Sequence, residues 1–238
     1  QSIRHLFTRC GDLNVEIRCS PPSKLLQGTI DSFKMRGQDL VIRREFETAE
    51  MTFETDAVAL DLGALFGGNI KLKQPTQAIS YVVLMEDAIN RAFEAELVKP
   101  RLQNLEEPAL TQLSGGDPVS FRDVSVTLQP NQRVTVKATT DLPNRADVPL
   151  QLSATLAVKK RRRLVFDDAS VDLEGIPADV QPLSRLLTEA LLDVLNAMVD
   201  LDRFNLDGIT LRLNRLETQG KKLIFSGYAQ IDHFPKAG

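Results

Sequence analysis

The sequence lacks tryptophan, and aromatic residues make up only 5% of its 238 residues. Its formal net charge is −3, whereas a nucleic-acid-binding face is usually strongly basic and interleaved with aromatic side chains. It also lacks a run of about 18 consecutive apolar residues, the length that a membrane-spanning helix requires. The composition therefore argues against a nucleic-acid partner and against a transmembrane segment. With 42% hydrophobic and 26% charged residues, it is otherwise ordinary for a globular protein.

Residues that carry common catalytic chemistry are also scarce. His5 and His233 are the only histidines, and they lie near opposite ends of the chain. No HExxH, zinc-spaced Cys/His or GxSxG motif accompanies them. Asp167 and Asp168 are adjacent, so on a strand they point to opposite faces and cannot work together as an acid and base pair. We therefore expect no catalytic residues, no metal site and no cofactor.

The two cysteines are predicted to be free thiols. A strand over residues 13–19, at about 3.3 Å per residue, separates Cys10 and Cys19 beyond the roughly 7 Å Cα distance that a disulfide allows. Free thiols favour a reducing compartment. Because the chain begins at Gln1, we expect that an N-terminal piece was removed. The expected location is the cytoplasm or the periphery of a membrane, or the periplasm where that piece was a secretion signal.

Two helices are predicted from apolar residues that recur at three- and four-residue steps. The clearer one lies between Pro182 and Phe204. Its apolar face is predicted to carry Leu183, Leu186, Leu187, Ala190, Leu191, Val194, Leu195 and Met198, with Ser184 and Thr188 on the other face. The second is expected to start near Glu86 and to kink or end at Pro100. One side of it carries Ile89, Ala92, Phe93 and Leu97.

Most of the remaining sequence alternates between apolar and polar residues, which predicts strands. Alternation is clear in residues 13–19, 49–53, 124–128, 150–158, 209–213 and 223–231. A change of phase between Phe53 and Val58 predicts a bulge or a turn near Asp56. Further turns are predicted at residues 37–38, 130–132, 143–147 and 219–220. These spacings favour long antiparallel hairpins.

The expected fold class is α+β, with about ten long strands in one mainly antiparallel sheet. Because strand twist accumulates, so large a sheet is expected to curve strongly or to split, and the amphipathic helices are expected to fill its concave side. Residues 104–118, with Glu-Glu-Pro and Ser-Gly-Gly-Asp-Pro clusters, read as a linker between halves of about 1–105 and 119–238. We expect the whole chain, 1–238, to form one domain.

Three segments are candidate binding elements. The leucine-rich face of the helix at 183–198 packs on the sheet, lines an apolar groove, or does both. Residues 62–68 form either a short helix capped by Gly67 and docked on the core, or an exposed tip whose Leu65 and Phe66 enter a bilayer. The basic run of Lys159, Lys160, Arg161, Arg162 and Arg163 is either a solvated hairpin tip or a contact to anionic lipid.

Several segments together resemble a known family. They are SKLLQGTIDS at 23–32, a strand at 38–43, LDLGALFGG at 60–68 and QPTQAISYVVLMEDAINRAF at 74–93. Their order is similar to that in the LmeA-like phospholipid-binding family, a group of unassigned function common in cyanobacteria and actinobacteria. The resemblance implies a fold similar to tubular lipid-binding (TULIP-like) proteins, in which a bent sheet wraps a long helix around a lipid channel. It implies no catalytic residues.

The leading hypothesis is a non-enzymatic protein that binds, and transfers, phospholipid or another acyl or isoprenoid lipid while touching a membrane surface peripherally. The predicted groove residues are Leu183, Leu186, Leu187, Leu191, Val194, Leu195, Met198, Ile89 and Phe93. One alternative is a ligand-free scaffold that docks a protein partner, and another is a lipid-modifying enzyme with an unrecognised polar site. The lipid and the oligomeric state are left open by the sequence.

Overall fold

The computed structural model describes residues 8–42, 45–66, 71–201 and 208–232, without the side chains of Leu65, Phe66 and Ile209. The expectations that concern His5, Gly67, Gly68, Phe204 and His233 therefore lie outside the described residues. Within them, Cys10 and Cys19 are free, as the sequence predicted.

Twelve strands are present in the described ranges, and the long ones match the alternating segments. They are β1 (Leu13–Arg18), β2 (Thr29–Ile30), β3 (Ser32–Ile42), β4 (Phe46–Thr55), β5 (Val58–Ala59), β6 (Thr76–Met85), β7 (Phe121–Leu128), β8 (Arg133–Leu142), β9 (Arg145–Lys159), β10 (Arg163–Val171), β11 (Ile209–Gln219) and β12 (Lys222–Ile231). The turn predicted near Asp56 is confirmed, since β4 ends at Thr55 and β5 begins at Val58.

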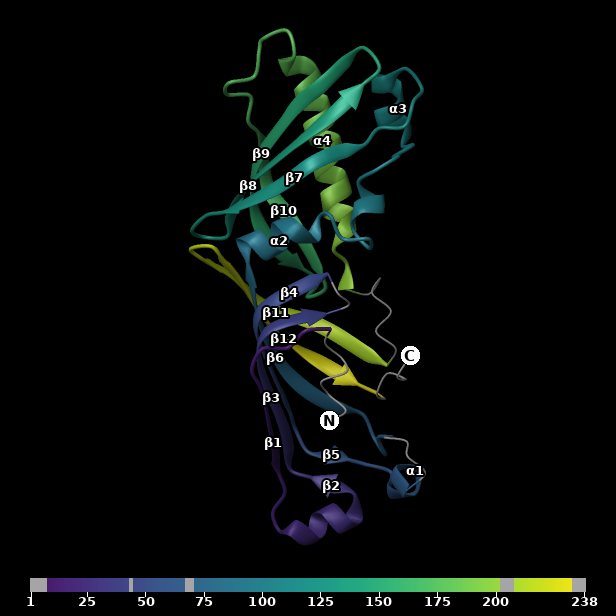
Figure 1. Cartoon of the computed structure of the whole chain (residues 1–238), viewed down its shortest axis with the longest axis vertical. Helices are drawn as coiled ribbons and strands as arrows, with labels where there is room; N and C mark the ends of the chain where they lie inside the picture. The colour runs from purple at the N-terminus through teal and green to yellow at the C-terminus, as the bar shows by residue number, and fades with distance from the viewer. Residues whose placement is uncertain (1–7, 43–44, 67–70, 202–207, 233–238) are drawn as a thin grey trace.

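The strands form two main sheets instead of the single ten-stranded sheet that was expected. One has the order β1-β3-β4-β6-β12-β11, the other the order β10-β9-β8-β7, and β2 pairs with β5. All these pairings are antiparallel, which confirms the α+β class. The last two strands return to the first sheet, because β12 pairs with β6 over its whole length (Figure 1). Both halves of the sequence thus build the six-stranded sheet.

The helices are short apart from α4 (Gln181–Met198), which confirms the main predicted helix and ends before Phe204. The others are η2 (Pro22–Gln27), α1 (Leu62–Phe66), α2 (Glu86–Ala92), η3 (Lys99–Arg101) and α3 (Pro108–Ser114). α4 packs along β9 and β10, on one side of the four-stranded sheet (Figure 1). Its buried leucines join the inward residues of β7, β8 and β9 in the main core.

A turn was predicted at Gly37 and Gln38, and this prediction is wrong. Both residues lie inside β3, where Gly37 pairs with Met51 of β4. A Cβ atom at position 37 would come within 2.7 Å of the Leu40 Cδ1 atom. The glycine therefore makes room for the buried Leu40 side chain, which is a packing role that resembles a turn signal in the sequence.

Residues 104–118, interpreted from the sequence as a linker, contain a folded element. The helix α3 lies in this segment, and its Leu110 side chain is buried in the main core. Leu105 and Val119 form a β-bridge that closes the segment at its base. The helix C-terminus is capped by Gly115, whose φ of 76° is a left-handed conformation that suits glycine. The proline and glycine clusters therefore mark the two ends of α3.

Candidate functional site

An apolar cavity of about 110 Å³ lies where α2 and the C-terminal end of α4 meet strands of both sheets. Every residue that lines it is apolar. They are Ile89 and Phe93 from α2 and its C-cap, Val126, Leu128, Leu156, Leu164 and Phe166 from the four-stranded sheet, Leu195, Met198 and Val199 from the end of α4, and Leu223 from β12. Four of the predicted groove residues, Ile89, Phe93, Leu195 and Met198, are thereby brought together.

The cavity is too small to enclose a lipid. Pockets that hold whole small-molecule ligands usually measure about 300–1,000 Å³. A volume of about 110 Å³ accommodates only the end of an acyl chain, so most of a phospholipid would have to lie elsewhere. A phospholipid could bind here only if an apolar surface continued from this cavity.

The six-stranded sheet supplies such a surface. Side chains of directly paired residues lie on the same face of an antiparallel sheet. One row therefore runs across all six strands through Leu13, Gly37, Met51, Val82, Phe225 and Leu216. We call the face that carries this row the apolar face. It also carries Val15, Ile17, Phe33, Met35, Phe53, Ala78, Leu84, Leu211, Leu213, Leu223, Ala229 and Ile231.

The apolar face is covered unevenly, since Met35, Leu216, Leu223 and Ile231 are buried whereas other large side chains are only partly covered. Met51, Phe53, Val82 and Phe225 are half-buried, and Ile17 at the edge of the sheet is 59% exposed. Among the described helices, the one with extensive contacts to this sheet is α2, which meets β4 and β6. A sheet face that is apolar and half-open in this way is suited to an apolar ligand.

The apolar face continues into the cavity at one end. Leu84 of β6 and Leu223 of β12 are direct cross-strand partners on this face. Leu223 is buried and lines the cavity, and Leu84 and Phe225 pack against the same main core. The two features therefore form one apolar surface that begins between α2 and α4 and extends over the six-stranded sheet.

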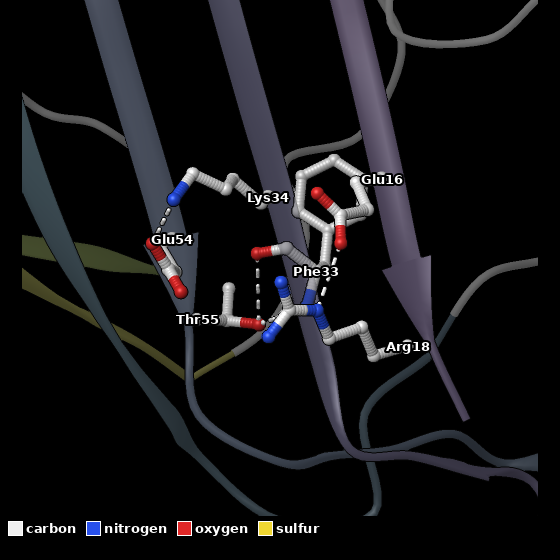
Figure 2. Close-up of polar contacts among 6 residues, drawn as sticks. All are labelled: Glu16, Arg18, Phe33, Lys34, Glu54 and Thr55. Carbon is white, nitrogen blue, oxygen red and sulfur yellow. Dashed lines mark hydrogen bonds and ion pairs between the residues drawn. The ribbon is translucent and has the colours of Figure 1, made fainter. Parts of the chain in front are cut away.

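The opposite face near the free edge of the sheet is charged (Figure 2). Lys34 Nζ donates to Glu54 Oε2 at 2.7 Å, and this hydrogen bond lowers the pKa of the Glu54 carboxyl. Arg18 Nε donates to Glu16 Oε1 at 2.8 Å, and this contact raises the pKa of the Arg18 guanidinium. Exposed pairs of this kind add little to stability. They make the opposite face polar near this edge, and the apolar Ile79, which is paired with Glu54 on the same face, is 70% exposed.

The predicted apolar face of α4 is rotated in the structure. Leu187, Leu191, Leu195 and Met198 are buried as expected, but so are Ser184 and Thr188, which were assigned to the polar side. Leu186 is 48% exposed and lies outside both the buried face and the cavity lining, so its predicted place in a groove stays a prediction. Leu183 and Val194 are partly buried against the main core.

The burial of Ser184 has a local reason. Its Oγ atom donates to the Pro149 carbonyl at 2.6 Å, which satisfies the hydroxyl group and ties α4 to β9. Of the leucines on this helix, Leu187 and Leu191 pack in the core between α4 and the sheet, and neither is among the residues that line the cavity. The part of α4 that lines the cavity is thus limited to its last turn.

The basic run at 159–163 forms the turn between β9 and β10, and most of its cations contact other parts of the protein. Lys159 Nζ donates to Asp167 Oδ1 at 2.9 Å. Arg161 donates to the Asn214 side chain and lies 4.8 Å from the centroid of the Tyr228 ring. Arg162 and Arg163 each lie 3.8 Å from the carboxylate of Asp200, which is buried. These contacts hold the turn against β11 and the end of α4.

The other candidate membrane element, residues 62–68, contains the short helix α1. The helix in the first of its two interpretations is confirmed for Leu62–Phe66, and Asp61 Oδ1 accepts from Ala64 N at its start. The cap at Gly67 lies outside the described residues, and docking on the core stays a prediction. The side chains of Leu65 and Phe66, on which membrane contact depends, lie outside the described residues. Their predicted role stays a prediction.

A second hollow, of about 160 Å³, lies on the other side of Phe93. It is lined by Phe93, Glu94, Lys99, Leu102, Gln103, Phe121, Arg122, Asp123 and Val124. Its two cations are already paired, since Lys99 contacts Glu94 and Arg122 contacts Asp141 and Asp147. The apolar cavity is therefore the better candidate for a lipid tail.

The fold and the site define a protein with an amphipathic sheet, an apolar cavity at one end of it and no catalytic group among the residues that line that cavity. The family model for LmeA-like phospholipid-binding proteins matches residues 1–227, and the chain belongs to this family. No curated protein and no solved structure matches the chain. None of the described helices has the length and apolar character needed to cross a membrane.

Proposed function

We propose that the protein binds a phospholipid by its acyl chains and carries it without modifying it. In this proposal the chains lie on the apolar face, and the end of one chain enters the cavity between α2 and α4. The six-stranded sheet bends around the bound chains, as in the tubular lipid-binding proteins that the sequence resembles. The headgroup stays outside, where it meets solvent or a membrane surface.

The observation that carries the proposal is the continuity between the apolar face and the cavity through Leu84 and Leu223. Each CH₂ group that leaves water gains about 0.8 kcal/mol, so an extended apolar surface can hold an acyl chain without a polar anchor. Membership of a phospholipid-binding family supports the same ligand class. The apolar lining supports binding over catalysis, because aliphatic side chains offer no acid, base or nucleophile.

Native mass spectrometry with organic extraction tests the proposal. The purified protein should carry phospholipid at one molecule per chain, or take it up from detergent-solubilised phosphatidylglycerol. The informative variant is Met51→Glu, because Met51 lies in the centre of the apolar face and is half-buried. It should lose most of the bound lipid, since an acyl chain over this position would remove the carboxylate from water at a large energetic cost.

The matched control is Thr52→Glu on the next position of the same strand. Thr52 points to the opposite face, where its cross-strand partner Arg36 accommodates a carboxylate. This variant should bind lipid as the wild type does. Wild-type protein that takes up no lipid under either condition, or equal loss in both variants, would refute the proposal, and the former result would favour a ligand-free scaffold.

A further inference from the structure

Two leucines at the end of the six-stranded sheet are presented to solvent. Leu25 and Leu26 belong to η2, and they are 55% and 81% exposed. η2 is the purple helical turn at the lower end of the molecule in Figure 1, at the opposite end from most of α4 and at the same end as α1. A single exposed leucine is common on protein surfaces. Two adjacent ones at an extremity need a separate explanation.

The loop that carries these leucines is held in place by hydrogen bonds. Asp31 accepts from Lys24 Nζ and from Ser20 N, both at 2.6 Å. At the other end of η2, Leu60 N donates to Gly28 O at 2.6 Å, and Lys73 Nζ donates to Gln27 O at 3.4 Å. The hydrogen bonds from both sides fix the orientation of η2. The leucines are therefore displayed by an ordered loop.

The leucine pair lies close in the chain to one end of the apolar face. The last row of that face contains Ile17 and its cross-strand partner Phe33, and Ile17 is the most exposed apolar residue of β1. The chain leaves β1 at Arg18 and enters η2 at Pro22. A short stretch of chain thus joins the exposed leucines to the end of the sheet on which the acyl chains are proposed to lie.

The charges beside the leucine pair suit a phosphate-rich surface. Lys71 and Lys73 are exposed, and Lys73 contacts the residue next to Leu26 through the Gln27 carbonyl. The Lys71 carbonyl accepts from Asp61 N, which places this lysine beside the start of α1. Exposed leucines flanked by lysines match the interface of a phospholipid bilayer, where apolar side chains enter the acyl region and cations meet the headgroups.

We infer that Leu25 and Leu26 insert into the surface of a phospholipid bilayer and that lipid passes between the bilayer and the apolar face at this end. This inference rests on the proposed function, because it identifies the route to the proposed lipid site. It differs from the interpretation of the sequence, which assigned membrane contact to Leu65 and Phe66 and to the basic run.

The test compares vesicle binding with lipid loading that bypasses the membrane. The double variant Leu25→Glu/Leu26→Glu is used with vesicles of phosphatidylcholine and phosphatidylglycerol. Its vesicle partition coefficient should fall roughly tenfold for each leucine, since burial of a leucine side chain contributes that much. Loading from detergent-solubilised phosphatidylglycerol should stay at the wild-type level.

Leu186→Glu is the matched control, because Leu186 is an exposed leucine on α4, away from the end of the molecule that carries η2. It should bind vesicles as the wild type does. The inference is overturned if the double variant partitions like the wild type, if Leu186→Glu weakens binding equally, or if only self-association of the chain changes. Failure of detergent loading in the wild type would instead refute the proposed function.

A second double variant tests the contribution of charge to vesicle binding. Lys71→Gln/Lys73→Gln should weaken binding to phosphatidylglycerol-containing vesicles by roughly fivefold for each lysine. Binding to pure phosphatidylcholine vesicles should not change. An equal loss on both kinds of vesicle would contradict the role assigned to these lysines.

Discussion

Asn90 of α2 and Val126 of β7 are joined by two hydrogen bonds. Asn90 Nδ2 donates to Val126 O at 3.1 Å, and Val126 N donates to Asn90 Oδ1 at 2.7 Å. Glu86 adds a third, since its Oε2 atom accepts from Leu128 N at 2.8 Å. The short helix that carries Ile89 and Phe93 is therefore fixed to the four-stranded sheet, and the cavity wall is fixed with it.

Replacement of Asn90 by alanine should loosen this attachment. Both polar atoms of Val126 would lose their partners in a part-buried place, which costs about 1–3 kcal/mol of unfolding free energy. Chemical denaturation measures the loss. Asn14→Ala is the control, because Asn14 is exposed on β1, and it should change the unfolding free energy by no more than about 0.5 kcal/mol. Similar losses in the two variants would contradict the assigned role of Asn90.

Two leucines of α4 should respond very differently to truncation. Leu195 is buried and lines the cavity, whereas Leu186 is largely exposed. Leu195→Ala should lower the unfolding free energy by about 2–5 kcal/mol, and Leu186→Ala by less than about 1 kcal/mol. Thermal or denaturant unfolding of both variants checks this. A larger effect at position 186 would mean that α4 is rotated relative to the structure described here.

The Asp31 carboxyl should titrate at unusually low pH. The hydrogen bond from Lys24, followed by that from Ser20 N, lowers its pKa below the ordinary value of 3.8. The stabilisation of the η2 loop is therefore fully present above pH 3.8 and is lost as the pH falls through the lowered pKa. An NMR titration of the carboxyl carbon measures the midpoint. Lys24→Gln should raise it, and an unchanged midpoint in that variant would contradict the assigned cause.

The basic turn should contribute to stability through Asp200. Removal of this buried carboxylate by Asp200→Ala leaves Arg162 and Arg163 without their shared partner and should cost about 1–3 kcal/mol. Lys160→Ala, at an exposed position of the same turn, should cost less than about 0.5 kcal/mol. Denaturant unfolding compares them. If Asp200→Ala is as mild as Lys160→Ala, the turn is a solvated tip.

Local patterns predicted most of the elements. Strict alternation gave β7, β9 and β12, and the leucine spacing gave α4, because each of these patterns is complete within one segment. The face of α4 was harder to assign. Ser184 is buried because its hydroxyl group meets the Pro149 carbonyl, and that partner lies 35 residues away in the chain.

The candidate site could be predicted only in part. Ile89, Phe93, Leu195 and Met198 were identified by their apolar character, and they do line the cavity. The apolar face was missed because it is assembled from six strands, and the pairing of β6 with β12 joins residues far apart in the sequence. Its signal was present as the alternation of each strand. Only the register shows that the apolar sides of all six strands coincide.

Photo-crosslinking with a phospholipid that carries a diazirine near the end of one acyl chain tests the central claim most directly. Peptide mapping by mass spectrometry should place the label on the apolar face and at the cavity, on residues such as Met51, Val82, Phe225 and Leu223. The neighbouring positions of the charged face, Lys34, Thr52 and Glu54, should remain unlabelled. Label on the charged face, or none on either face in protein that carries the lipid, would contradict the account.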